Sequence, residues 1–220
     1  EISGAGLSGR WQGVEVALER PEGGDQALAT RLRIGGRAQT ITFADPLRAD
    51  AAATLAALRA EGITASILSG DRAAPVEAAA RELGLAAAAE TSPQAKLAAL
   101  EALKAQGRRP LMVGDGLNDG PALAAAHASI APGSASDASQ QAADAVFIGE
   151  ALMPVALAVR VARATMRIVR QNFGFSIAYN VLAVPLALFG LVTPLIAAIA
   201  MSVSSLVVVA NSLRLAKAAR

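Results

Sequence analysis

Two carboxylates and an amide cluster around a glycine turn in the middle of the chain. In the segment Met112–Leu123, MVGDGLNDGPAL, Asp115 ends an apolar run, and Asn118 and Asp119 follow one turn later. Oxygen donors of this kind form a hard site suited to Mg²⁺, which favours carboxylates together with phosphate and water. The segment therefore predicts a magnesium site, and an ordinary Asx turn is the structural alternative.

The elements that must position these side chains alternate between strand and helix from residue 41 onward. Five apolar runs are short enough for buried strands: Ala38–Phe43, Thr64–Leu68, Pro110–Val113, Ala128–Ala131 and Ala145–Ile148. Four amphipathic stretches lie between them: Arg48–Glu61, Pro75–Leu83, Ala95–Gln106 and Gly120–Ala126. This order predicts an α/β fold, a parallel sheet with helices on both faces. Strands that end at Asp45, Asp71 and Asp115 would place carboxylates where open α/β sheets hold their ligands.

Residues 1–40 have a different texture, rich in glycine with short alternating runs. Trp11–Leu18 and Ala27–Ile34 are typical of hairpin strands, and a turn is expected at Gly35–Arg37. This set is too small to bury a core alone, so we interpret it as the remnant of a larger domain.

Composition separates the two ends of the chain. Of its 220 residues, 54% are hydrophobic and 17% are charged, and cysteine is absent, which excludes disulfides and thiolate metal sites within it. Residues 151–220 contain seven Lys or Arg and no Asp or Glu. The uncharged stretch Phe173–Leu213 is 41 residues long, about twice the roughly 20 residues that cross a bilayer. A purely soluble protein is therefore not expected.

The C-terminal third is predicted to be a connecting helix followed by a transmembrane helical hairpin. Residues 151–172 have apolar side chains at helical spacing, interrupted by four arginines, as in an amphipathic helix that approaches a membrane. Two spans, Phe173–Gly190 and Pro194–Leu213, occupy residues 173–213, and residues 214–220 form a basic tail. Basic residues at both ends predict that both ends of the hairpin face the cytoplasm. A buried hydrophobic hairpin of a large soluble protein is the alternative.

The string GDGLNDGPAL resembles the hinge signature of the P-type ATPases, with Gly120 where alanine is commoner. Four other segments resemble motifs of that family: LSGD at Leu68–Asp71, SPQAKL at Ser92–Leu97, DPLR at Asp45–Arg48 and GAG at Gly4–Gly6. The resemblance implies a Rossmann-like, HAD-type phosphorylation domain at residues 41–150, preceded at residues 1–40 by part of a nucleotide-binding domain.

The resemblance also implies ATP and Mg²⁺ as cofactors and assigns a role to each motif residue. Lys96 and Asp71 would be catalytic, with Lys96 facing the transferred phosphate, where a cation neutralises charge. Nucleotide would be bound by Gly4, Gly6 and Asn118, and Mg²⁺ by Asp115 and Asp119.

The last two helices resemble those of copper-transporting heavy-metal ATPases, in the strings AYNVLAVPLA and MSVSSLVVVANSLRL. The segment VTPLIAAIAMS most resembles the corresponding sequence of copper pumps linked to cytochrome oxidase assembly. Cu⁺, or Ag⁺ as an alternative, would be held by Tyr179, Asn180, Met201 and Ser205. Met201, Ser204 and Ser205 share a helix face at spacings of three and four. A thioether beside neutral oxygens suits a soft monovalent ion, and helix packing is the alternative explanation.

As a member of this family the chain would be part of a multi-pass protein of a bacterial inner membrane, with its globular part cytoplasmic. Its partners would be the lipid bilayer, the upstream part of the same polypeptide, a copper chaperone and oxidase assembly factors, and no nucleic acid. The family's phosphorylated Asp, in Asp-Lys-Thr-Gly-Thr, does not occur in these residues. The chain alone is therefore expected to be inactive.

Two other functions are alternatives to this one. A phosphatase of the same fold needs a nucleophilic Asp with a second Asp two residues later, but Leu47 occupies that place after Asp45. A non-catalytic membrane-anchored fragment remains open.

Overall fold

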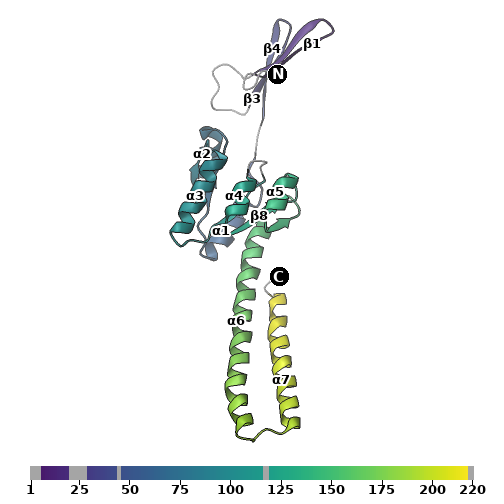
Figure 1. Cartoon of the computed structure of the whole chain (residues 1–220). Helices are drawn as coiled ribbons and strands as arrows, with labels where there is room; N and C mark the ends of the chain where they lie inside the picture. Colours follow the sequence, from purple (N-terminus) through teal and green to yellow (C-terminus); the bar gives the residue numbers. More distant parts are fainter. Residues whose placement is uncertain (1–5, 20–28, 44–45, 116–118, 218–220) are drawn as a thin grey trace. The chain divides into compact units, whose positions relative to one another are not determined.

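The computed structural model describes residues 6–19, 29–43, 46–115 and 119–217, and Figure 1 labels the α-helices and some of the strands. The chain divides into two compact units. One unit contains residues 1–52 and 64–151, and the other contains residues 53–63 and 152–220. Asp45 lies outside the described residues.

The N-terminal strands form an antiparallel sheet in the order β1-β2-β3-β4. These strands are β1 (Gly6–Trp11), β2 (Val14–Glu19), β3 (Ala29–Ile34) and β4 (Arg37–Thr42). The predicted turn after Ile34 is confirmed: Ile34 pairs with Arg37, and Gly35 has a φ of 57°, as two-residue hairpin loops require.

Two predictions in this region are wrong. The run Trp11–Leu18 is broken at Gln12 and Gly13, which both have positive φ and reverse the chain between β1 and β2. The run Ala38–Phe43 does not join the parallel sheet, because it pairs antiparallel with β3 as strand β4. The boundary predicted at residue 40 therefore falls inside a strand. Alternation of apolar residues identifies a strand but does not name its partner.

The predicted parallel α/β architecture is confirmed, as two parallel ladders, β5-β6 and β7-β8-β9. The strands are β5 (Ser66–Leu68), β6 (Ala86–Ala88), β7 (Leu111–Val113), β8 (Ala128–Pro132) and β9 (Ala145–Phe147). The helices are α1 (Ala51–Ala60), α2 (Ala73–Leu83), α3 (Pro93–Ala105), α4 (Gly120–Ala125) and α5 (Asp137–Ala142). Strand β6 and helix α5 were not predicted. Three alanines have a low strand propensity, and α5 is a six-residue helix in a polar stretch.

Two sets of contacts hold this α/β region together. Leu100, Met112, Ala122 and Leu123 form a buried apolar cluster that joins α3, β7 and α4. Ser129 in β8 is 1% exposed and bonds to Asp144, the residue before β9. The Asp144 Oδ2 atom accepts from the Ser129 N–H at 2.9 Å and its hydroxyl at 3.2 Å, and the Ser129 Oγ atom accepts from the Asp144 N–H at 3.1 Å.

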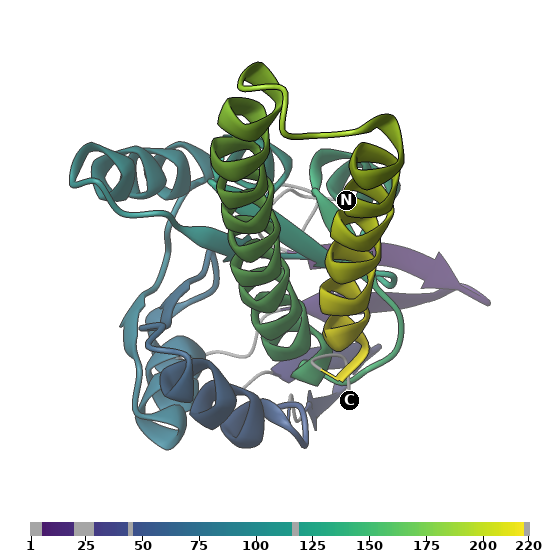
Figure 2. The ribbon, with the colours of Figure 1, turned by 90° about the horizontal axis from the view of Figure 1, so that it is seen from below.

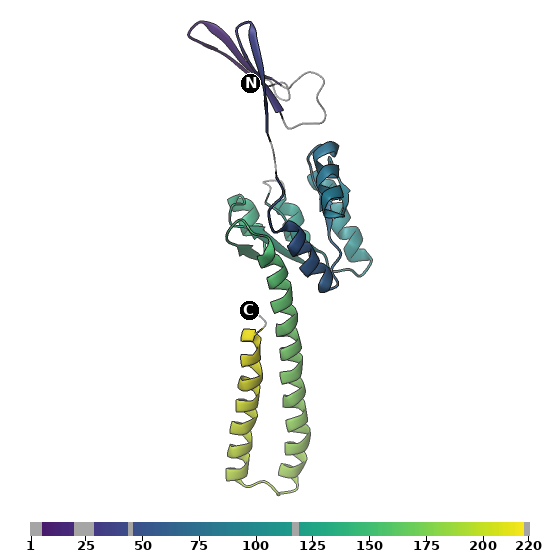
Figure 3. The same ribbon diagram turned by 180° about the vertical axis from the view of Figure 1, so that it is seen from behind.

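The second unit contains an antiparallel pair of long helices, α6 (Met153–Leu188) and α7 (Pro194–Leu213), followed by a short 3₁₀ helix, η1 (Arg214–Lys217). Figures 1, 2 and 3 all show α6 and α7 side by side. The predicted connecting helix and first span are one continuous helix of 36 residues. The loss of charge after Asn172 changes the surface of α6, but it does not interrupt the backbone hydrogen bonds.

One helix of the described chain, Pro194–Ala216, is long and apolar enough to cross a membrane, with a mean hydropathy of 2.0 over its best window. The neighbouring part of α6 is also apolar and exposed, and Phe173, Leu182 and Leu188 are between 66% and 82% exposed. An apolar surface of this kind is unusual for a domain that is surrounded by water.

Polar side chains join α6 to α7 at the end of the hairpin that carries η1. The Asn211 side-chain amide donates to the Asn172 Oδ1 atom at 2.9 Å and to the Gln171 Oε1 atom at 3.3 Å. Asn172 donates to the Ser212 Oγ atom at 3.0 Å, and Arg214 donates to the Asn211 Oδ1 atom at 3.1 Å. We refer to these five residues as the amide latch, and they fix the register of α7 against α6 at that end.

Replacement of Asp144 by alanine should loosen the β8–β9 ladder. The N–H and hydroxyl groups of Ser129 would lose their acceptor while remaining buried, which costs about 2 kcal/mol. Native-state hydrogen exchange of the β8 amides in the purified chain measures this loss. The control is Glu77→Ala on the exposed surface of α2, for which a change within about 0.5 kcal/mol is expected. Equal protection of β8 in both variants would contradict the role of Asp144.

Candidate functional site

The candidate site is built from the loops that follow β5, β6 and β7. Ser69 and Asp71 follow β5, Thr91 follows β6, and Asp115 follows β7. In each parallel ladder the strands end at the same edge, which is the edge where α/β proteins bind ligands.

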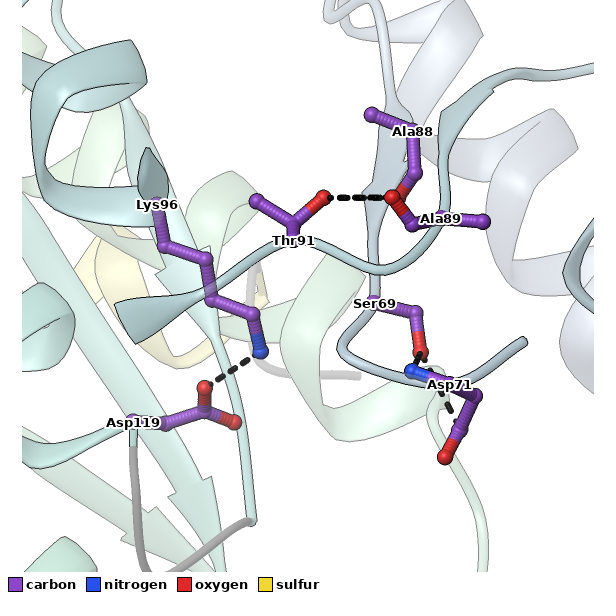
Figure 4. Close-up of polar contacts among 7 residues, drawn as sticks. All are labelled: Ser69, Asp71, Ala88, Ala89, Thr91, Lys96 and Asp119. Carbon is purple, nitrogen blue, oxygen red and sulfur yellow. Dashed lines mark hydrogen bonds and ion pairs between the residues drawn. The ribbon is translucent and has the colours of Figure 1, made fainter. Parts of the chain in front are cut away.

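The centre of the site is an ion pair between Lys96 and Asp119. The Lys96 Nζ atom donates to the Asp119 Oδ1 atom at 2.6 Å, and the two residues are 9% and 8% exposed. Figure 4 shows the Lys96 ammonium pointing toward the Asp119 carboxylate. Hydrogen bonds between two charged groups are short and strong, and removal of one partner from a buried pair leaves an uncompensated charge. The sequence named both residues but did not predict that they contact each other.

The start of α3 determines where Lys96 lies. The Ser92 Oγ atom accepts from the Ala95 N–H at 3.1 Å, and Pro93 occupies the first turn, so the helix begins at a defined residue. Lys96 is four residues beyond this cap, and its N–H donates to the Ser92 carbonyl. The Pro-x-x-Lys spacing thus places the ammonium group one turn into the helix.

Gly114 is a site residue that the sequence analysis did not single out. A Cβ atom at this position would lie 2.9 Å from the Asp119 Oδ2 atom and 3.3 Å from its Cβ atom. The absence of a side chain therefore leaves room for the carboxylate that faces Lys96. The position of Gly114 directly before Asp115 in the motif is the sequence signal that could have indicated a close approach of another group there.

Asp115 lies exposed at the end of β7, and Asn118 lies outside the described residues. The chemistry of the donors fits Mg²⁺, because a carboxylate at a strand end and a second one nearby in sequence are oxygen ligands. Among the residues that the structure describes, no three His, Cys, Asp or Glu side chains gather around one point. Asp115 is the more accessible ligand of the predicted pair, since one oxygen of Asp119 is already bonded to Lys96.

Asp71 is held by the serine two residues before it. The Ser69 hydroxyl donates to the Asp71 Oδ2 atom at 3.0 Å, and the Asp71 N–H donates to the Ser69 Oγ atom at 3.1 Å. Figure 4 shows that Ser69 and Asp71 occupy one loop, and that Thr91 lies between that loop and the Lys96–Asp119 pair. The hydroxyl that the LSGD motif supplies therefore orients the carboxylate.

The two glycines predicted to bind nucleotide have different outcomes. Gly4 lies outside the described residues. Gly6 has a φ of 129°, and a Cβ atom there would lie 2.1 Å from the Leu18 carbonyl oxygen. Pairing of β1 with β2 is thus sufficient to explain a glycine at this position, and its contact with nucleotide stays a prediction.

The four residues predicted to bind Cu⁺ do not converge on one point. Tyr179 lines a pocket of about 510 Å³ between α6 and α7, together with Ser204 and mostly apolar neighbours. Asn180, Met201 and Ser205 are exposed and do not line that pocket. The Asn180 amide donates to the Ser176 carbonyl of its own helix at 2.8 Å. The ion site stays a prediction.

Comparison with known proteins agrees with this geometry. Residues 10–127 match the family model of the haloacid dehalogenase-like hydrolases. The chain is 46% identical to the nitrogen fixation protein FixI of Bradyrhizobium diazoefficiens, over 97% of this chain and 31% of that protein. It is 38% identical to the probable copper-exporting P-type ATPase V of Mycobacterium tuberculosis, over 93% of this chain and 27% of that protein.

A solved structure extends the match to both units. The crystal structure of a zinc-transporting PIB-type ATPase in the E2·Pi state has a TM-score of 0.74 at 29% identity, and it covers 100% of this chain and 38% of that one. The chain thus spans about a third of the length of these curated relatives, such as FixI. The chain belongs to the haloacid dehalogenase-like hydrolase family and is homologous to the heavy-metal P-type ATPases.

Proposed function

We propose that this chain carries the phosphorylation-domain portion of an ATP-driven Cu⁺ pump, whose cycle forms and hydrolyses an aspartyl phosphate. The observation that carries the proposal is the buried Lys96–Asp119 pair at the strand-end edge. An ammonium held there can neutralise charge on a transferred phosphoryl group, which is the main requirement of phosphoryl transfer. Homology to cation-transporting P-type ATPases supports the same activity.

In this proposal each site residue has a separate role. Lys96 contacts phosphoryl oxygens, Asp119 holds the Lys96 ammonium in place, and Asp71 orients substrate from the neighbouring loop. Mg²⁺ would be held by Asp115, with Asp119 nearby, and when bound it neutralises developing negative charge. Asn118, Gly4 and Gly6 would contact nucleotide.

The transported ion is the second part of the proposal. The uncharged stretch Phe173–Leu213 contains no carboxylate, histidine or cysteine. Its donors include the thioether of Met201 and the neutral oxygens and amide of Tyr179, Asn180 and Ser205, a set that suits Cu⁺ or Ag⁺ better than Zn²⁺. The copper-exporting relative supports this choice, and the zinc-transporting structure makes Zn²⁺ the competing ion.

Location and partners follow from the same proposal. The second half of α6 and all of α7 would cross a bacterial inner membrane as a hairpin, with the α/β unit in the cytoplasm. The remaining part of the polypeptide would supply the phosphorylated Asp and thiolate ligands for Cu⁺. A copper chaperone and oxidase assembly factors would be its further partners, as the resemblance to copper pumps linked to cytochrome oxidase assembly implies.

The 220-residue chain alone should not form a phosphoenzyme, because an acyl phosphate needs the acceptor Asp that these residues lack. Incubation of the purified chain with γ-labelled ATP and Mg²⁺ should leave it unlabelled. Acid-stable, hydroxylamine-sensitive label on the chain would contradict this prediction.

Replacement of Lys96 by methionine in the full-length protein should lower phosphoenzyme formation by about 100-fold, as loss of one preorganised donor does in other enzymes. The control is Lys104→Met on the same helix, whose side chain is 39% exposed and whose ammonium pairs with Glu101 and donates to the Ala125 carbonyl. The double variant Lys96→Met, Asp119→Leu should recover folding stability, since no charge is left buried, but should stay inactive. Recovery of phosphorylation in the double variant would show that the pair is only structural.

Replacement of Met201 by alanine in the full-length protein should lower both the Cu⁺ stoichiometry and the copper-stimulated ATPase rate, because the thioether is the softest donor in this region. Ser202→Ala is the matched control, since the Ser202 hydroxyl bonds to the Ala198 carbonyl of its own helix. Unchanged copper binding in Met201→Ala would reject the site, and activation of the wild type by Zn²⁺ but not Cu⁺ would reject the ion.

A further inference from the structure

Glu90 has a backbone conformation that its residue type does not favour. Within the described ranges, only Gln12 and Glu90 combine a positive φ, 50° in each case, with a residue other than glycine. Gln12 lies in the two-residue turn between β1 and β2, where the hairpin requires this conformation. Glu90 lies in no hairpin: it follows the parallel strand β6, beside the candidate site. A strained residue at such a place invites a functional explanation.

The conformation of Glu90 joins two loops of the site through the main chain. The Glu90 N–H donates to the Asp71 carbonyl at 2.8 Å, and the Thr91 N–H donates to the Ser69 carbonyl at 2.8 Å. On the other side, the Ser69 N–H donates to the Ala88 carbonyl at 2.9 Å. These three bonds continue the β5–β6 ladder beyond its regular end and tie both ends of the Ser69–Asp71 loop to the segment after β6.

Thr91 strengthens the same junction. Its hydroxyl contacts the Ala88 and Ala89 carbonyls at 3.1 and 3.2 Å, and Figure 4 shows it between Ser69 and Lys96. A Cβ atom on Gly70 would lie 3.5 Å from the Thr91 carbonyl oxygen, so the two loops approach each other closely there. The next residue, Ser92, caps α3, which carries Lys96. The segment from Ala88 to Thr91 therefore connects the Asp71 loop to the start of the lysine helix.

The side chain of Glu90 takes no part in this junction. It is exposed, and no side-chain hydrogen bond or ion pair of Glu90 occurs in the described part of the chain. What the junction requires of position 90 is a residue that can hold a left-handed backbone. Glycine and asparagine adopt this conformation readily, glutamate and glutamine adopt it at some cost, and β-branched residues strongly resist it.

We propose that Glu90 is a positioning residue whose backbone conformation holds Asp71 and Lys96 in the mutual placement that lets both act on one phosphoryl substrate. This inference rests on the proposed function, because it assumes that Asp71 and Lys96 serve the same reaction. The left-handed turn at Glu90 is connected to both groups. Its N–H donates to the Asp71 carbonyl, and two residues later Ser92 caps the helix that carries Lys96.

The test compares three replacements of Glu90 in the full-length protein. Glu90→Val opposes the left-handed backbone, Glu90→Gly favours it, and Glu90→Gln removes only the charge. Glu82→Val, on the exposed surface of α2, controls for loss of a glutamate and gain of a branched side chain. The rate of phosphoenzyme formation is measured against ATP concentration, so that KM and kcat separate.

We expect KM for ATP to rise about tenfold in Glu90→Val, equivalent to about 1.4 kcal/mol, and to stay within about twofold of wild type in the Gly, Gln and control variants. A similar rise in Glu90→Gln or Glu90→Gly would assign the effect to the carboxylate and overturn the proposal. An unchanged KM in Glu90→Val would also overturn it. If the valine variant unfolds, Glu90→Ala carries the same test with an expected rise of about threefold.

Hydrogen exchange tests the junction at Glu90 independently of the proposed phosphorylation activity. The amides of Glu90 and Thr91 should exchange slowly in the wild type and faster in Glu90→Val, while the global unfolding midpoint changes little. Equal protection in both proteins would overturn the junction. If the wild type accepts no phosphate from ATP but the exchange difference is present, the proposed function fails while the junction stands.

Discussion

A buried ammonium group must keep its counter-ion, and this constraint governs the architecture of the candidate site. Lys96 and Asp119 are separated by 23 positions in sequence, yet they must lie in hydrogen-bond contact, because an unpaired charge at this depth would be costly. The Ser92 cap places the lysine one turn into α3. The missing side chain of Gly114 makes room for the carboxylate, and the apolar cluster around Leu123 fixes α3 against α4. The helix cap, the glycine and the apolar cluster therefore all help to position the Lys96–Asp119 ion pair.

Sequence reasoning succeeded for the parts of the site that depend on local order. The strand-end positions of Asp71 and Asp115 follow from apolar runs that end in a polar residue. It could not predict which strands pair. Ala38–Phe43 has a strand pattern whether its partner is parallel or antiparallel, and Ala86–Ala88 has no strand pattern although it forms β6.

In the helical unit, too, the sequence predicts some features and not others. Hydropathy identified the apolar region, but it carries no information about rotation or register between two helices. The prediction of a Cu⁺ site rests on helix-face spacing and on the resemblance, and the structure places Tyr179 in the interhelical pocket while Met201 is 63% exposed. The register is set by the amide latch around Asn211, whose partners lie 39 and 40 positions away. Such distant amide contacts leave no periodic signal in a sequence.

The continuity of α6 has a mechanical consequence. A helix of 36 residues is about 54 Å long, so a tilt of only about 5° displaces one end by roughly 5 Å relative to the other. In the first half of α6, the Arg163 guanidinium donates to the main-chain carbonyl of Glu61 and, at 3.1 Å, to its carboxylate. Three positions after Glu61 the chain leaves the helical unit, and it then forms β5, the strand that ends at the Asp71 loop. The contact between Arg163 and Glu61 therefore ties α6 to the segment of chain that leads into β5 and the Asp71 loop.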